Sequence, residues 1–151
     1  MQKTNHNKTF FFALVCAIVL ACTCLFACGK EQKSVDARIL LSTETSVVFT
    51  VENADEGATL LDAMYALEEQ GELTFEVENG QYGAFMKGIN GVENGFGDNP
   101  CWISYTSDTA LSNTAWGTYE YGEQTLGSTV VGMSTLTVKV GEIYAWVYTQ
   151  F

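Results

Sequence analysis

The chain has 151 residues, of which 7 are Lys or Arg and 18 are Asp or Glu, so its formal net charge is −11. Such an acidic chain lacks the clustered basic residues that bind nucleic acid phosphates, which excludes that class of partner. The length predicts one folded domain rather than several. Composition alone indicates no function, whereas the order of residues along the chain is more informative.

The first 27 residues have the organisation of an export signal. Lys3 and Lys8 flank a polar start, and residues 10–27 then run apolar with Thr23 as the only interruption. A basic start, an apolar stretch and a small residue before the cleavage point are typical of a secretory signal. A stretch of this length is also a candidate transmembrane helix, so an uncleaved anchor is the alternative.

The end of the apolar stretch favours cleavage and lipidation. Residues 25–29, Leu-Phe-Ala-Cys-Gly, resemble a bacterial lipobox, in which Cys28 is acylated on sulfur and the signal is cut directly before it. A weaker match ends at Cys22, but charged residues begin right after Cys28 and favour the later position. We therefore expect residues 1–27 to be removed and residues 28–37 to form a lipidated tether. The lipid would hold the protein at the outer face of the bacterial cytoplasmic membrane.

Cleavage before Cys28 limits the chemistry open to the mature chain. Removal of Lys3 and Lys8 leaves 5 basic residues against 18 acids, a net charge of −13. The only histidine, His6, is removed as well, which excludes histidine-dependent nucleophilic catalysis and His-ligated zinc, iron or cobalt. Cys101 remains as the only free thiol, so no internal disulfide can form, and we expect this thiol to be buried and inert.

Residues 38–151 predict one β-rich domain that contains one helix. Residues 39–51 are rich in Val, Ile, Thr and Phe, which predicts one or two strands. Residues 59–70 predict the helix, because Thr59 can cap it with Asp62 in the capping-box position. An apolar stripe at helical spacing gives the helix a buried face, and it consists of Leu60, Leu61, Met64 and Leu67.

Strand patterns follow the helix. Residues 73–78 alternate between apolar and polar, and the pair Asn79-Gly80 predicts a turn into a partner strand over residues 82–89. The remaining predicted strands cover residues 101–106, 136–140 and 143–151. One early helix in a run of strands predicts an α+β fold, with a mixed sheet and the helix packed across one face. A β-grasp arrangement is the most specific expectation.

Four segments of the domain occur in a specific order: TLLDAM (59–64), YGAFMKGING (82–91), WISY (102–105) and VGEIYAWVY (140–148). Together they resemble the C-terminal domain of transcobalamin and intrinsic factor, and more closely a bacterial lipoprotein family of unknown function that shares this domain. The resemblance covers residues 59–149. It implies a β-grasp fold and, from the eukaryotic relatives, contact with one side of cobalamin as a ligand, not as a catalytic cofactor. The chain differs from compact members by an extended β insertion over residues 112–136.

The resembling segments suggest a ligand face. The residues assigned to it are Tyr82, Phe85, Ile89, Asn90, Gly91, Trp102 and Tyr105. Glycine in the turn at residues 89–91 would let a ligand approach the backbone. The alternative interpretation is an ordinary turn beside a core tryptophan.

Aromatic residues elsewhere suggest two further surfaces. The insertion contains Trp116, Tyr119 and Tyr121, which are typical of a surface that contacts a protein or a glycan, or which pack the insertion onto the sheet. Three more aromatic residues alternate along the last predicted strand, namely Tyr144, Trp146 and Tyr148. They share one face, which we expect to pack under the helix stripe; a stacking surface for a flat ligand is the alternative.

The mature sequence shows no catalytic motif. Its acids lack the spacing of an EF-hand, and it contains neither a phosphate-binding loop nor a Gly-x-Ser-x-Gly motif. We therefore expect a monomeric binding module without a metal or cofactor, not an enzyme. The leading partner is a small molecule, with corrinoids as the named candidate. The alternative is an envelope protein or glycan that contacts the insertion, and the membrane is contacted through the lipid only.

Overall fold

The computed structural model describes residues 32–95 and 99–150. The predicted signal over residues 1–27 and the lipidation site Cys28 lie outside the described residues. Residues 33–151 form one compact unit with its own hydrophobic core, as expected of a domain that folds by itself. Among the described residues, no helix is long and apolar enough to cross a membrane.

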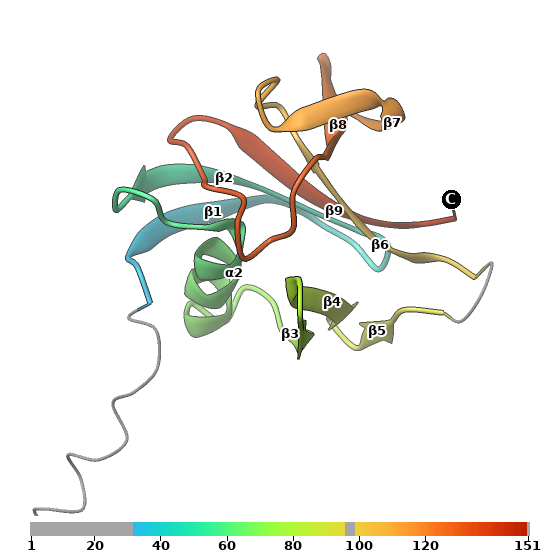
Figure 1. Cartoon of the computed structure of the whole chain (residues 1–151), viewed down its shortest axis with the longest axis horizontal. Helices are drawn as coiled ribbons and strands as arrows, with labels where there is room; N and C mark the ends of the chain where they lie inside the picture. Colours follow the sequence, from blue (N-terminus) through green and yellow to red (C-terminus); the bar gives the residue numbers. More distant parts are fainter. Residues whose placement is uncertain (1–31, 96–98, 151) are drawn as a thin grey trace, which may run out of the picture. The chain divides into compact units, whose positions relative to one another are not determined.

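The described part of the chain contains nine strands and one helix (Figure 1). In chain order they are β1 (Val35–Ser42), β2 (Ser46–Ala54), α2 (Leu60–Glu69), β3 (Phe75–Gly80), β4 (Gly83–Ile89), β5 (Val92–Glu93), β6 (Cys101–Thr106), β7 (Ser112–Tyr121), β8 (Gln124–Thr129) and β9 (Ile143–Thr149). The architecture is α+β and largely sheet, which confirms the predicted fold class. Within the segment predicted to be an extended β insertion, residues 112–129 form the β7–β8 hairpin.

The strands form two sheets. The large sheet has six strands in the order β1-β2-β9-β6-β8-β7, and the small sheet has three in the order β3-β4-β5. Every pairing among these strands is antiparallel, so the prediction of a mixed sheet was wrong. Several neighbours are successive strands joined by short turns, and short turns can join antiparallel strands only.

The helix follows its sequence signals closely. Thr59 Oγ1 accepts a hydrogen bond from the Asp62 backbone N–H, and Asp62 Oδ2 accepts one from the Thr59 backbone N–H at 2.8 Å, which completes the predicted capping box. The stripe residues Leu60, Met64 and Leu67 are fully buried. The helix face predicted from periodicity therefore faces the core.

Two predicted elements differ from the structure. Residues 136–140 form no strand; instead the Leu136 carbonyl accepts from the Leu60 N–H at the start of α2, at 2.8 Å. This segment therefore accepts a hydrogen bond from the first turn of the helix rather than pairing with a sheet edge. The pair Asn79-Gly80 ends strand β3, and the turn lies two residues later than predicted, at Gln81 and Tyr82.

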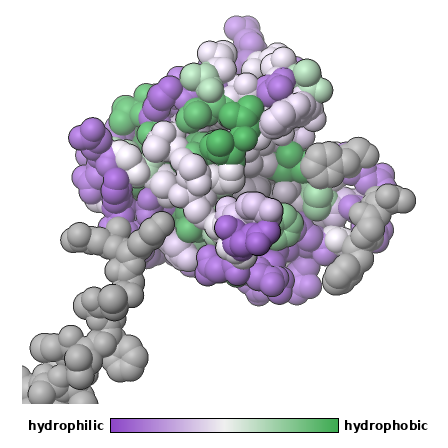
Figure 2. Space-filling view, in the orientation of Figure 1, coloured by the Kyte–Doolittle hydropathy of each residue, from purple (hydrophilic) through white to green (hydrophobic). Residues whose placement is uncertain are grey.

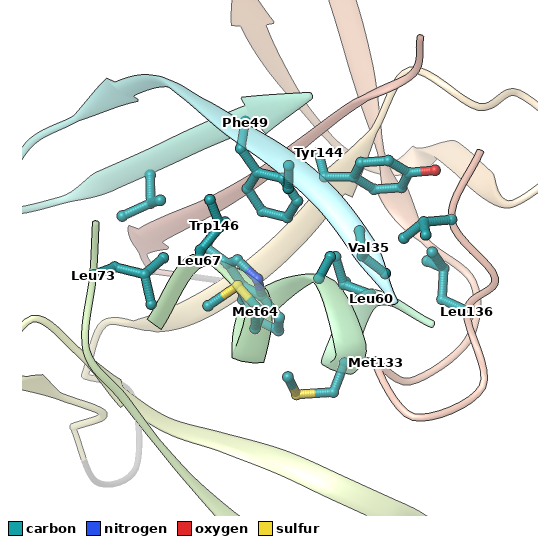
Figure 3. Close-up of a cluster of buried hydrophobic side chains, with 14 of the residues drawn as sticks. Val35, Phe49, Leu60, Met64, Leu67, Leu73, Met133, Leu136, Tyr144 and Trp146 are labelled. Carbon is teal, nitrogen blue, oxygen red and sulfur yellow. The ribbon is translucent and has the colours of Figure 1, made fainter. Parts of the chain in front are cut away.

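Each face of the large sheet carries a hydrophobic cluster. The helix and the small sheet cover one face (Figure 1), where α2 side chains point toward the strands (Figure 3). The prediction that Tyr144 and Trp146 pack under the helix stripe is confirmed, since both belong to this buried cluster with Leu60 and Met64. The Tyr144 ring stacks on Phe49 with centroids 5.7 Å apart. The opposite face carries a smaller cluster of Val48, Tyr105, Leu126 and Ala145.

A buried ion pair fastens the segment before β9 to the turn after β6. Asp108 is 5% exposed, and its Oδ2 lies 2.6 Å from Lys139 Nζ. Its Oδ1 accepts from the Ala110 N–H at 3.0 Å, whereas Oδ2 has no hydrogen-bond partner among the described residues apart from the ion pair. Lys139 therefore provides the charge that balances a carboxylate removed from water.

We expect Lys139→Met to lower the free energy of unfolding by about 1–3 kcal/mol, because it leaves the Asp108 carboxylate buried and unpaired. The loss is smaller than for a fully buried ion pair because the Lys139 side chain is half-exposed. Urea unfolding of residues 33–151, followed by tryptophan fluorescence, measures it. Arg38→Met is the matched control, since Arg38 and Glu52 form an exposed pair worth about 1 kcal/mol or less. Equal losses in the two variants would contradict this account.

Candidate functional site

A cavity of about 540 Å³ lies between the large sheet and strand β4 of the small sheet. The chain has three tryptophans, and all three line this cavity: Trp102, Trp116 and Trp146. Phe85 adds a fourth aromatic ring. The volume falls within the range of about 300–1,000 Å³ that is typical of small-molecule sites.

The large sheet forms one wall through strands β6 and β9. Trp102 and Ser104 are two residues apart on β6 and share a face, and Trp146 lies opposite Ser104 on β9. Trp102 Nε1 donates to the Val92 carbonyl at 2.8 Å, and the Trp102 ring contacts the Tyr148 ring at a centroid distance of 5.4 Å. The Trp102 ring is therefore fixed before any ligand binds.

Two exposed aromatic residues form the rim. Phe85 is 64% exposed and Trp116 is 62% exposed, although both line the cavity. Phe85 comes from β4 and Trp116 from β7, so the two sheets each supply one side of the rim. The face of the molecule in Figure 2 is a mixture of hydrophilic and hydrophobic side chains, and the hydrophobic ones occur in several places.

A bulge in strand β7 carries Trp116. Asn113 pairs with Ser128 and Thr118 pairs with Gly127, so residues 114–117 have no partners on β8. Asn113 Oδ1 accepts from the Ala115 N–H at 2.9 Å, and Gly117 has a φ of 145°, which favours glycine. Bulges re-aim side chains, and this one allows Trp116 to reach the cavity.

The insertion therefore completes the cavity. Besides Trp116, it contributes Ser128 and Thr129 of β8 and the following residues up to Met133. The Ala84 N–H on β4 donates to Ser134 Oγ at 2.8 Å, which fastens the small sheet to this segment. Phe85 and Trp102 of the predicted ligand face thus meet Trp116 of the predicted interaction surface at one site.

Other predicted ligand residues lie elsewhere. Tyr82 is 89% exposed beside the β3–β4 turn and does not line the cavity, and Ile89 is fully buried in the core. Asn90 and Gly91 form an exposed turn with φ values of 50° and 80°, and Asn90 Oδ1 accepts from the Thr74 N–H. Both turn residues border a smaller cavity of about 240 Å³.

Tyr105 lies on the opposite face of the large sheet from Trp102. Its ring contacts Tyr119 at a centroid distance of 6.1 Å, and Tyr119 and Tyr121 pack against the same cluster. Burial raises the pKa of the Tyr105 hydroxyl. The three aromatic residues of the insertion therefore do not form one exposed surface, since Trp116 faces the cavity while the two tyrosines pack around Tyr105.

The described lining of the cavity is uncharged. None of the described residues that line it carries a formal charge at neutral pH. Polar side-chain atoms come from hydroxyls and from Cys101, which is half-buried rather than buried as expected, because it lines the cavity. Burial raises the pKa of its thiol. No group of His, Cys, Asp and Glu in residues 32–95 and 99–150 is arranged to hold a metal.

Sequence reasoning missed Ser104, Thr129 and Met133 as lining residues. Ser104 had one available signal, its two-residue spacing from Trp102. No family model, curated protein or solved structure matches the chain. The resemblance to the transcobalamin C-terminal domain therefore stays a prediction.

We expect Cys101 to be alkylated more slowly at pH 8 than an unfolded cysteine, because burial raises its pKa and lowers the thiolate fraction. Residues 33–151 contain only this cysteine. The rate of Cys101 alkylation by iodoacetamide is measured across the alkaline range. Its rise should begin at a higher pH for the folded domain than for the same domain in urea. Superimposable pH profiles would show that the thiol is not shielded.

Proposed function

We propose that the domain is a binding module for a small, flat and largely apolar molecule that occupies the tryptophan-lined cavity. The observation that carries this proposal is the convergence of all three tryptophans, with Phe85, on one cavity of about 540 Å³. Aromatic rings offer large rigid surfaces for stacking against a flat ligand. Trp102 is already held in place by its hydrogen bond to Val92.

Trp146 supports a ligand role beyond packing. Its side chain is 5% exposed, and its Nε1 has no hydrogen-bond partner among the described residues. A buried N–H without a partner costs about 1–3 kcal/mol, a cost that phenylalanine would avoid. A requirement for indole at the cavity wall accounts for tryptophan at this position.

The residues that line the cavity are better suited to binding a ligand than to catalysing a reaction. The polar side chains that line the cavity are one thiol and three hydroxyls, from Cys101, Ser104, Ser128 and Thr129. General acid–base chemistry needs a titratable group near neutral pH within reach of the substrate, and the lining provides none. The proposal is therefore a monomeric binding protein, not an enzyme.

The resemblance to the transcobalamin C-terminal domain supports a corrinoid as one named ligand. As part of the same proposal, the domain is related to β-grasp folds. A corrinoid is a flat macrocycle that would stack on the exposed rim of Phe85 and Trp116. An envelope protein or glycan is less well supported, because only Trp116 of the three insertion aromatics is largely exposed.

We expect residues 33–151 to bind the neutral dye N-phenyl-1-naphthylamine, whose fluorescence rises in apolar surroundings. Phe85→Ala and Trp116→Ala should each weaken binding about tenfold, because each removes a stacking ring worth about 1–2 kcal/mol. Tyr82→Ala is the matched control, since Tyr82 is exposed on the same hairpin but lies outside the lining. Cyanocobalamin and cobinamide are then tested as competitors.

The assignment of the cavity would be wrong if Tyr82→Ala weakened dye binding as much as the rim variants do. It would also be wrong if neither rim variant weakened dye binding. Competition by either corrinoid would support the named ligand. Dye binding without competition would keep the cavity and exclude corrinoids.

We further propose that the protein is exported and anchored through lipid on Cys28, as the resemblance of residues 25–29 to a lipobox suggests. In a bacterial host, the full chain should incorporate an alkyne-labelled palmitate and sediment with membranes. Cys28→Ala should lose the label, whereas Cys22→Ala should retain it. Label that is lost only in Cys22→Ala would move the site to the earlier cysteine.

A further inference from the structure

We infer that the cavity selects an uncharged ligand that carries a hydroxyl or carbonyl group at one edge of its ring system. This inference rests on the proposed function and names the chemical class of the ligand. It comes from the uncharged lining of the cavity and from a pair of hydroxyls that lies beside Trp146.

The described lining of the cavity disfavours a charged ligand. No described residue that lines the cavity is charged, so a charged ligand would find no counter-charge after leaving water. Burial of an unpaired ionised group is strongly unfavourable. The carboxylates that dominate the chain's net charge of −11 also disfavour anions at longer range. Both effects disfavour ligands with a net negative charge, such as free carboxylates and phosphate monoesters.

Three neighbouring strands contribute one row of side chains to the cavity wall. Ser104 on β6 lies opposite Trp146 on β9, and the β6–β8 register places Thr129 at the next position on its other side. Ser104 Oγ and Thr129 Oγ1 are 2.6 Å apart, and both residues line the cavity. The row Trp146–Ser104–Thr129 therefore joins an aromatic surface directly to a pair of hydroxyls.

The hydroxyl pair has capacity for a further partner. Two hydroxyls carry two protons and four acceptor lone pairs, and the bond between them uses one proton and one lone pair. The second proton can be donated to a ligand oxygen, and the remaining lone pairs can accept a ligand hydroxyl proton. A ring stacked on Trp102 and Trp146 would present its edge to this pair.

The pair can be removed without leaving an orphaned group. Replacement of both partners by apolar residues of similar shape is nearly neutral for stability, because neither group is left buried and unpaired. Ser104→Ala combined with Thr129→Val is therefore a clean test. Thr125→Val, on the same strand but outside the lining, is the matched control.

The experiment compares three probes of equal ring size on residues 33–151: pyrene, 1-hydroxypyrene and 1-pyrenecarboxylate. Energy transfer from tryptophan to the bound ring system reports binding. We expect 1-hydroxypyrene to bind about fivefold more tightly than pyrene, as one net hydrogen bond provides, and the carboxylate to bind at least about tenfold more weakly than 1-hydroxypyrene. The double variant should lose the preference for the hydroxyl, so that it binds 1-hydroxypyrene and pyrene with equal affinity.

The outcomes separate this inference from the proposed function. If pyrene binds but the double variant keeps the hydroxyl preference, or the carboxylate binds as tightly as 1-hydroxypyrene, the selection rule is wrong and the binding cavity stands. If no probe binds the folded domain, both the rule and the proposed cavity function fail. Loss of the preference in Thr125→Val as well would also overturn the assignment to Ser104 and Thr129.

Discussion

Strand β9 is the element on which the rest of the domain depends, because it pairs with β2 on one side and β6 on the other. Without it, the large sheet would separate into the β1–β2 hairpin under the helix and the β6–β8–β7 portion beside the cavity. Alternation along β9 directs Tyr144 and Trp146 to one face and Ala145 to the other. A single strand therefore supplies side chains to both hydrophobic clusters and to the cavity wall.

The cavity is continuous with the core at Trp146 and Met133. Both residues are nearly buried members of the main cluster, and both also line the cavity. Occupation of the cavity would thus add contacts to side chains that already hold the helix against the sheet. Ala84, Met86 and Trp102 belong to both sets as well. Since a ligand that binds only the folded state stabilises it, binding and stability are linked through these shared residues.

Local signals in the sequence were sufficient for the elements that depend on neighbouring residues. The helix and its cap follow from the Thr59–Asp62 pair and the apolar stripe, and strand β6 has the predicted bounds of residues 101–106. The spacing of Trp102 and Tyr105 already implied opposite faces, since residues three apart on a strand point in opposite directions. Grouping them as one ligand face ignored that parity.

Features that depend on distant pairing could not be predicted. Residues 136–138 look like a strand because their apolar residues alternate, yet their backbone groups bond to the start of the helix, far away in sequence. The position of Trp116 depends on a change of register between β7 and β8 after Asn113. Nothing in the local sequence fixes that register, so the approach of Trp116 to Phe85 and Trp102 was not visible from the chain alone.

The bulge in β7 has a consequence for association between molecules. Strand β7 is an edge of the large sheet, and an uninterrupted edge offers its unpaired N–H and C=O groups to the strand of another chain. The four unpaired residues at 114–117 break that row in the middle of the strand. The feature that carries Trp116 to the cavity therefore also makes this edge of the sheet a poorer template for pairing with the strand of another chain.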